Sequence, residues 1–279
     1  MSPSLVCKGL RALARDVFIY DLQDFDTLLG GLVLAAGVTN TNFYTMVNII
    51  INVLPPGPFF LQNDNGTTVV RDTQPLLPGR YFIVADGTIQ VVLTRTMSIQ
   101  SGTQTGSFRN QVRERDGRCV AVHIFPLAYE HQWLHGGWSQ RITIPAQRGG
   151  SINSVQNGLL LRNDIHQLFD LYHFSINPDP DNEGIAGTSL DDPQRPLDVL
   201  LQWHFRQDVL TNMRGAGEPH FEHDFPPGSD IMGDIRDGPN AAERMEFELF
   251  GRLAHHMDIN SEEKQDEEDE QGGNVSDKG

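Results

Sequence analysis

Three side chains that can bind a divalent cation recur at helical spacing in the middle of the chain. His166, Asp170 and His173 stand four and then three positions apart, so on a helix they would form one row. Imidazole and carboxylate groups are common ligands of divalent metals. The apolar residues of this segment fall on another face: Ile165, Leu168, Phe169 and Tyr172. The spacing predicts a helix that packs by one face and presents a candidate metal site on another, with ordinary polar surface residues as the alternative.

A histidine and an asparagine with possible chemical roles precede this helix. His123 lies in a short apolar, strand-like run that ends at Pro126. Asn157 stands directly before the apolar segment 158–162, which we expect to be a buried strand. A neutral imidazole can accept a proton near pH 7, whereas the alternative for His123 is an ordinary core residue.

The segments around these residues predict an α+β protein. The first hundred residues are β-rich, with a strand at 17–20, a helix over 41–53, and two hairpins that pair 59–62 with 67–70 and 80–85 with 88–94. A short helix is expected between 108 and 118, and longer helices over 197–213 and 241–257. The stretches 177–192 and 218–237 are rich in Pro, Gly, Asp and Asn and predict loops.

The charge of the chain limits the classes of partner. The net charge is −16, and the segment 261–279 contributes −6 with eight acids and two lysines, so −10 remains elsewhere. We expect that segment to be a disordered acidic tail, and the acidity argues against a protein that coats nucleic acid without sequence preference. The sequence contains one modest cluster of basic residues, formed by Arg109, Arg113, Arg115 and Arg118. The simpler interpretation of this cluster is a solvated helix face.

Other sequence features point to an intracellular protein of the cytoplasm or nucleus. The two cysteines, Cys7 and Cys119, cannot build a disulfide framework. No apolar run reaches the roughly 20 residues of a membrane helix. The first residues lack the uninterrupted apolar stretch of a secretory signal.

The order strand-His, loop-Asn, strand, helix-His resembles the HNH family of ββα-metal nucleases. Three sequence segments are similar to those of HNH-nuclease-domain proteins that are abundant in filamentous fungi: H-I-F-P-L, I-N-S-V-Q-N-G-L-L-L-R and D-I-H-Q-L-F-D. The likeness extends through F-I-Y-D-L before this core and N-M-R-G-A-G-E-P after it, and covers nearly the whole chain except the acidic tail.

The resemblance implies a metal-dependent endonuclease with a ββα-metal core and flanking C-terminal helices. His123 would be the general base, and Asn157 would hold the strand or the ring of this histidine. A divalent cation, Mg²⁺ with Mn²⁺ or Zn²⁺ as alternatives, would stabilise charge at the scissile phosphate of nucleic acid, DNA rather than RNA. Its expected ligands are His166, Asp170, Asp164 and His173. The expected contacts to nucleic acid are Arg118, Arg141 and Arg162.

Two departures from the family pattern leave alternatives open. Many HNH enzymes carry an acidic ligand directly before the first histidine, and this chain has Val122 there. His123 could then itself be a ligand, with His131 or His135 as the base. In addition, Cys119 and Val120 run straight into the first histidine motif, where relatives have a longer insert. A catalytically inactive HNH-like domain that serves as a binding or regulatory module is therefore the alternative function.

The predicted organisation has four parts. A β-rich region of unknown function covers 1–100 and the HNH-type core covers 107–178. A loop-rich and helical extension covers 179–258, and the acidic tail covers 259–279. The sequence indicates no particular protein partner.

Overall fold

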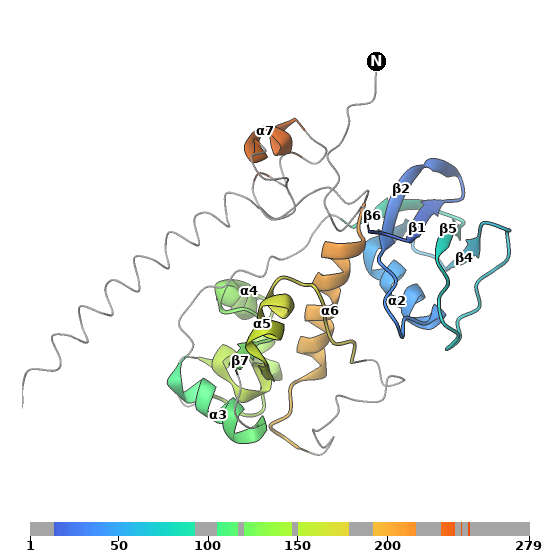
Figure 1. Cartoon of the computed structure of the whole chain (residues 1–279). Coiled ribbons are helices and arrows are strands. Elements are labelled where there is room, and N and C mark those ends of the chain that lie inside the picture. The colour runs from blue at the N-terminus through green and yellow to red at the C-terminus, as the bar shows by residue number, and fades with distance from the viewer. Residues whose placement is uncertain are drawn as a thin grey trace, which may run out of the picture. The chain divides into compact units, whose positions relative to one another are not determined.

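The computed structural model describes residues 14–92, 105–116, 120–146, 150–178, 192–215 and 230–237, together with 241 and 245 (Figure 1). These residues form two compact units. The first unit draws on the ranges Met1–Met97, Leu171–Asn182 and Leu201–Ala241. The second unit draws on the ranges Ser98–Asp170, Glu183–Leu200 and Ala242–Gly279.

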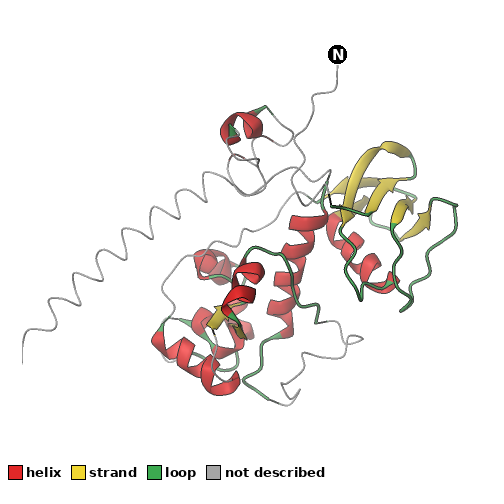
Figure 2. Cartoon of the chain, viewed as in Figure 1, coloured by secondary structure: helices red, strands yellow, loops and turns green. Residues whose placement is uncertain are grey.

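The first unit contains a four-stranded sheet, drawn in yellow in Figure 2. Its strand order is β2-β1-β5-β4. Its strands are β1 (Val17–Asp21), β2 (Asp24–Leu32), β4 (Phe59–Asn63) and β5 (Gly79–Ala85). β1 pairs antiparallel with β2 and parallel with β5, and β4 pairs antiparallel with β5. The predicted strand at 17–20 is thus confirmed, whereas β2 was not predicted.

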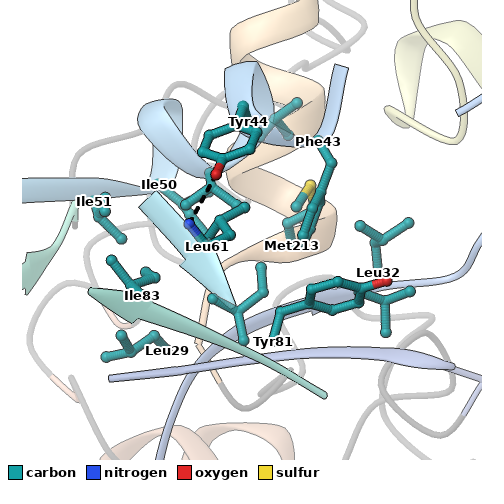
Figure 3. Packing of buried hydrophobic residues seen from close by; sticks show 14 of the residues in the cluster. Leu29, Leu32, Phe43, Tyr44, Ile50, Ile51, Leu61, Tyr81, Ile83 and Met213 are labelled. Carbon is teal, nitrogen blue, oxygen red and sulfur yellow. Dashed lines mark hydrogen bonds between the residues drawn. The ribbon is translucent and has the colours of Figure 1, made fainter. Parts of the chain in front are cut away.

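Helix α2 (Asn40–Ile50) packs on one face of this sheet and closes the core. Thr39 begins the helix with a capping box, in which the Thr39 hydroxyl accepts from the Asn42 backbone N–H at 3.2 Å. On the buried side of α2, Phe43 and Ile50 pack with Leu61 and residues of α6 (Asp198–Met213), among them Met213 (Figure 3). The Tyr44 hydroxyl accepts a hydrogen bond from the Leu61 N–H at 2.9 Å, so a polar group in this core is satisfied.

The strand pairing in this unit differs from the predicted hairpins. α2 ends at Ile50, and the next residues form β3 (Ile51–Leu54), which pairs with β6 (Thr88–Val91) in a separate two-stranded sheet. The strands on both sides of Asp86-Gly87 therefore exist, but they belong to different sheets. A Cβ on Gly87 would lie 2.7 Å from the Leu54 carbonyl oxygen, so this crossing requires glycine. The hairpin predicted between 59–62 and 67–70 is present in part. β4 pairs along its length with β5, while Thr68 forms an isolated antiparallel bridge with Gln62 and the Val69 N–H donates to the Leu61 carbonyl at 2.8 Å.

The second unit is assembled from short helices around a small sheet. Its elements are α3 (Gly106–Asp116), β7 (Val120–His123), η1 (Leu127–Tyr129), α4 (Glu130–His135), η2 (Trp138–Arg141), η3 (Ser151–Asn153), η4 (Val155–Asn157), β8 (Gly158–Leu161) and α5 (Asn163–Asp170). The predicted α+β class is confirmed by the mixture of sheets and helices in the two units.

The C-terminal predictions have different outcomes. The helix expected over 197–213 is confirmed as α6, and Gly215 follows it with a φ of 61°. A short helix, α7 (Ile231–Arg236), occupies part of the stretch that was predicted as a loop. The acidic tail and almost all of the helix predicted over 241–257 lie outside the described residues. None of the described helices is both long and apolar enough to cross a membrane.

Candidate active site

The centre of the second unit is a pair of antiparallel strands followed by a helix. In the pair formed by β7 and β8, Val122 faces Leu159 and His123 faces Gly158. α5 follows β8 in the chain and lies beside β7 (Figure 1). The predicted order of strand, strand and helix is therefore present, with His123 at the end of the first strand, Asn157 just before the second, and His166 on the helix.

His123 lies in an apolar, nearly closed environment. Only 6% of the residue is exposed. Its imidazole stacks on the ring of Phe108 from α3, with the ring centroids 3.8 Å apart and the planes within 10°. Burial lowers the pKa of His123 from 6.5 to about 3, and the side chain of Asn153 has a smaller, opposite effect. His123 is therefore neutral near pH 7.

The Nε2 atom of His123 is buried and forms no hydrogen bond with the described residues. A buried nitrogen without a partner costs free energy, and such groups in native proteins often reflect a missing water, ion or substrate. In a neutral imidazole, Nε2 can accept a proton or bind a metal.

Gly158 allows this stacking because it leaves room for α3 against the strand pair. A Cβ on Gly158 would lie 2.4 Å from Val112 Cγ2 and 3.0 Å from the ring of Phe108. Any larger residue would push α3, and with it the ring that covers His123, away from β8.

Asn157 holds the backbone of the segment that directly follows His123. Its side chain is fully buried; Oδ1 accepts from the Phe125 N–H at 2.8 Å and Nδ2 donates to the Phe125 carbonyl at 3.0 Å. Nδ2 also donates to the Ile152 carbonyl at 2.9 Å, while the Asn157 carbonyl accepts from the Ile124 N–H. The asparagine thus holds the segment just after His123 by its backbone. Its catalytic relevance stays a prediction.

Gln156 supports the same loop and was not identified from the sequence. It is 2% exposed, and its Oε1 accepts from the Thr143 N–H at 2.8 Å and the Ile144 N–H at 3.1 Å. Its Nε2 donates to the Thr143 hydroxyl and the Pro193 carbonyl. The repeated amides in S-I-N-S-V-Q-N were the available signal, since such side chains often replace regular backbone pairing in turns.

Arg115 is a structural residue rather than part of a solvated basic face. Its side chain is only 3% exposed and is paired with Asp116. The guanidinium donates to the carbonyls of Val155 at 3.0 Å, Gly158 at 2.9 Å and Gln194 at 2.8 Å. The arginine thereby attaches α3 to the loop that carries Asn157.

Helix α5 brings together only part of the predicted row of ligands. His166 Nε2 and Asp170 Oδ2 are 2.9 Å apart, and this contact raises the pKa of His166 above its usual value of 6.5. α5 ends at Asp170, and Tyr172 adopts a positive φ of 55°, so the prediction that His173 continues the row on one helix is wrong. The predicted apolar face is also wrong for Leu168, which is 41% exposed, while Phe169 is fully buried.

The described residues fit a divalent cation only in part. His166 and Asp170 supply one imidazole and one carboxylate from a single helix face. Among the described residues, no three His, Cys, Asp or Glu side chains gather as a metal site, and the side chain of Asp164 lies outside the described set. Mg²⁺ usually keeps several waters and takes one or two carboxylates, so the Asp170 carboxylate suits it. The His166 imidazole is a ligand typical of Zn²⁺ or Mn²⁺, but a zinc site needs three or four protein ligands.

The remaining predicted residues lie on the surface or outside the described part. Arg141 is exposed, with its guanidinium 5.6 Å from the ring centroid of Trp138, and Arg162 is exposed directly after β8. Arg118 lies outside the described residues. Of the alternative bases, His135 is exposed on α4, and the side chain of His131 is not described.

Comparison with known families agrees with this geometry. Residues 103–177 match the family model described as HNH endonuclease, and residues 14–90 match the model described as Domain of unknown function (DUF8573). No curated protein and no solved structure matches the chain. The chain thus carries an HNH endonuclease family domain at 103–177, which confirms the predicted resemblance, while nothing in the comparisons supports the predicted fungal origin.

Proposed function

We propose that this chain, with its HNH endonuclease domain at 103–177, is a divalent-metal-dependent endonuclease that hydrolyses nucleic-acid phosphodiester bonds, in DNA rather than RNA. The observation that carries the proposal is the state of His123. A neutral imidazole whose buried Nε2 forms no hydrogen bond with the described residues stands at the end of β7, in the ββα arrangement that also contains the His166–Asp170 pair.

Each residue has a distinct proposed role. His123 acts as the general base and takes a proton at Nε2 from the attacking water. Asn157 is a positioning residue, because it holds the backbone just after this histidine. His166 and Asp170 hold the cation, Mg²⁺ before Mn²⁺ or Zn²⁺, with Asp164 and His173 as further candidate ligands. When bound, a divalent cation supplies charge neutralisation at the scissile phosphate.

The wider assignments belong to the same proposal. Arg118, Arg141 and Arg162 contact the phosphate backbone. The region 1–100 and the HNH-type core at 107–178 are separate domains, followed by an extension at 179–258 and an acidic tail at 259–279. The protein works inside the cell, in the cytoplasm or nucleus.

A second candidate function is a catalytically inactive HNH-like module that binds nucleic acid or another partner. Two observations favour it. A group of three metal-binding side chains is absent from the described residues. An imidazole with a pKa of about 3 is also a weak base.

The test is cleavage of supercoiled plasmid by the full chain with Mg²⁺, Mn²⁺ or Zn²⁺ and, separately, with EDTA. Expected results are metal-dependent nicking by the wild type and loss of nicking in His123→Ala and His166→Ala. Leu134→Ala is a matched control, because Leu134 is 62% exposed on neighbouring α4. His135→Ala tests the alternative base. Equal cleavage by wild type and both histidine variants, or none with any metal, would overturn the proposal; loss only in His135→Ala would move the base to that residue.

A further inference from the structure

One face of the four-stranded sheet in the first unit carries clustered aromatic side chains away from the core. Tyr81 and Ile83 in β5 belong to the core, so Phe82 between them points to the opposite face. There the ring of Tyr20 stacks on Phe82 with a centroid distance of 5.8 Å, and Phe25 meets Phe82 edge-on at 5.2 Å.

Two of the phenylalanines on this side are widely exposed. Phe25 is 54% exposed. Phe60 in β4 is 41% exposed, and it alternates with Leu61, which is fully buried in the core. In the pairing of β4 with β5, Phe60 faces Val84 and Gln62 faces Phe82, so Phe60 lies diagonally beside Phe82. We call Tyr20, Phe25, Phe60, Arg80 and Phe82 the outer face. Phe82 is only 6% exposed and Tyr20 is half-buried, so the exposed rings of this face are those of Phe25 and Phe60. Exposed apolar rings beside such a cluster are typical of an interaction surface.

The outer face already holds one guanidinium group. The Cζ of Arg80 lies 4.9 Å from the ring centroid of Tyr20 and 5.2 Å from that of Phe82. Its Nε is 3.8 Å from an Asp64 carboxylate oxygen, and the two side chains are 46% and 53% exposed. The rings therefore accept a cation on their faces, with a carboxylate in reach to pair with it.

The charge around the outer face is negative. From residue 14 to residue 92 the chain has three arginines, seven aspartates and no lysine or glutamate, a sum of −4. Asp24 and Asp26 flank Phe25 and are exposed. This distribution repels a polyanion such as nucleic acid and attracts a cation.

We propose that the outer face binds a basic polypeptide segment of a partner protein. Arginine or lysine side chains of the segment stack on the exposed rings of Phe25 and Phe60 and pair with the surrounding aspartates. This proposal concerns a surface in the 14–90 region and does not depend on nuclease activity.

The test uses the full chain and a fluorescein-labelled peptide of alternating arginine and glycine residues, followed by fluorescence anisotropy at physiological salt. The double variant Phe25→Leu with Phe60→Leu keeps the apolar surface and every charge, but removes two aromatic faces. Loss of two cation–π contacts predicts about tenfold weaker binding. Val70→Ala with Leu77→Ala is the matched control, since these residues are 63% and 68% exposed and carry no charge. Acidic residues elsewhere in the chain are the same in the wild type, the phenylalanine variant and the control, so any peptide binding by them is the same in all three proteins.

Weakening in the phenylalanine variant but not in the control supports the proposal. Equal binding by all three proteins overturns it. If a labelled oligothymidine binds the wild type and this binding is lost in the phenylalanine variant, the proposal is overturned in favour of single-stranded nucleic acid. A wild-type dimer in light scattering that the leucine variant converts to a monomer overturns it in favour of self-association.

Discussion

The burial of His123 makes the stability of the second unit depend on pH in the acid range. In the unfolded chain the imidazole has its usual pKa of 6.5, whereas burial lowers the folded pKa to about 3. Protons therefore bind the unfolded state first as the pH falls below 6.5. The stabilising contribution of neutral His123 is complete above that value, and is lost progressively as the pH falls toward 3.

The size of this loss follows from the two pKa values. Between pH 7 and pH 5 the unfolded imidazole becomes mostly protonated while the folded one stays neutral, which lowers the free energy of unfolding by about 2 kcal/mol. His123→Phe keeps a flat ring to stack on Phe108 and removes the titrating group. Other groups titrate alike in both proteins, so we expect the wild type to lose about 2 kcal/mol more than His123→Phe over this range.

The assay is urea unfolding at both pH values, followed by tryptophan fluorescence. Trp133 is 1% exposed and belongs to the same unit as His123, so its emission reports on the relevant transition. NMR titration of the His123 ring protons gives an independent readout of the folded pKa. Equal pH dependence in both proteins, or a titration of His123 near 6.5, would refute the reasoning.

Three further predictions concern the same unit. Gly158→Ala brings a Cβ to 2.4 Å from Val112 Cγ2 and should lower the free energy of unfolding by about 1–3 kcal/mol. Gly106→Ala, whose Cβ would meet none of the described residues within 4 Å, should change it little in the same urea titrations. Asn157→Ala removes three buried side-chain hydrogen bonds and should cost about 2–4 kcal/mol, visible as a lower urea midpoint, and an unchanged midpoint would contradict the positioning role. The pKa of His166 is raised above 6.5, so protons compete with a bound cation at this imidazole. Calorimetry should therefore show weaker Mn²⁺ binding by the wild type at pH 6 than at pH 8. In His166→Ala, the residual Mn²⁺ binding should not depend on pH.

The local patterns of the sequence predicted the elements better than their partners. Strand-forming residues stand on both sides of Asp86-Gly87, and a two-residue loop of this type normally closes a hairpin. The structure instead pairs β5 with β1 and β4, and β6 with β3. Which strand a segment joins depends on contacts with residues far away in the chain, and periodicity holds no information about them.

The end of α5 shows a similar limit. The spacing of His166 and Asp170 correctly predicted that they lie on the same side of a helix, because positions four apart are neighbours on any helix. The helix stops at Asp170, and the left-handed backbone that follows falls on Tyr172. Glycine or asparagine usually occupies the left-handed position after a helix, so the sequence did not predict this conformation at a tyrosine. The predicted helix therefore does not extend to His173, whose role as a metal ligand stays a prediction.

The properties of His123 that bear on catalysis are also set at long range. The motif identified a histidine at the end of a strand, but its stacked ring comes from Phe108, and a further influence comes from Asn153. Gly158 permits the approach of α3, and Arg115 holds that helix in place through three backbone carbonyls. The same contacts that keep His123 neutral also leave it only 6% exposed, so a water nucleophile can reach Nε2 only if substrate or cation binding opens this environment. Cleavage that depends on His123 would thus require movement of the Phe108 ring or of the loop before β8.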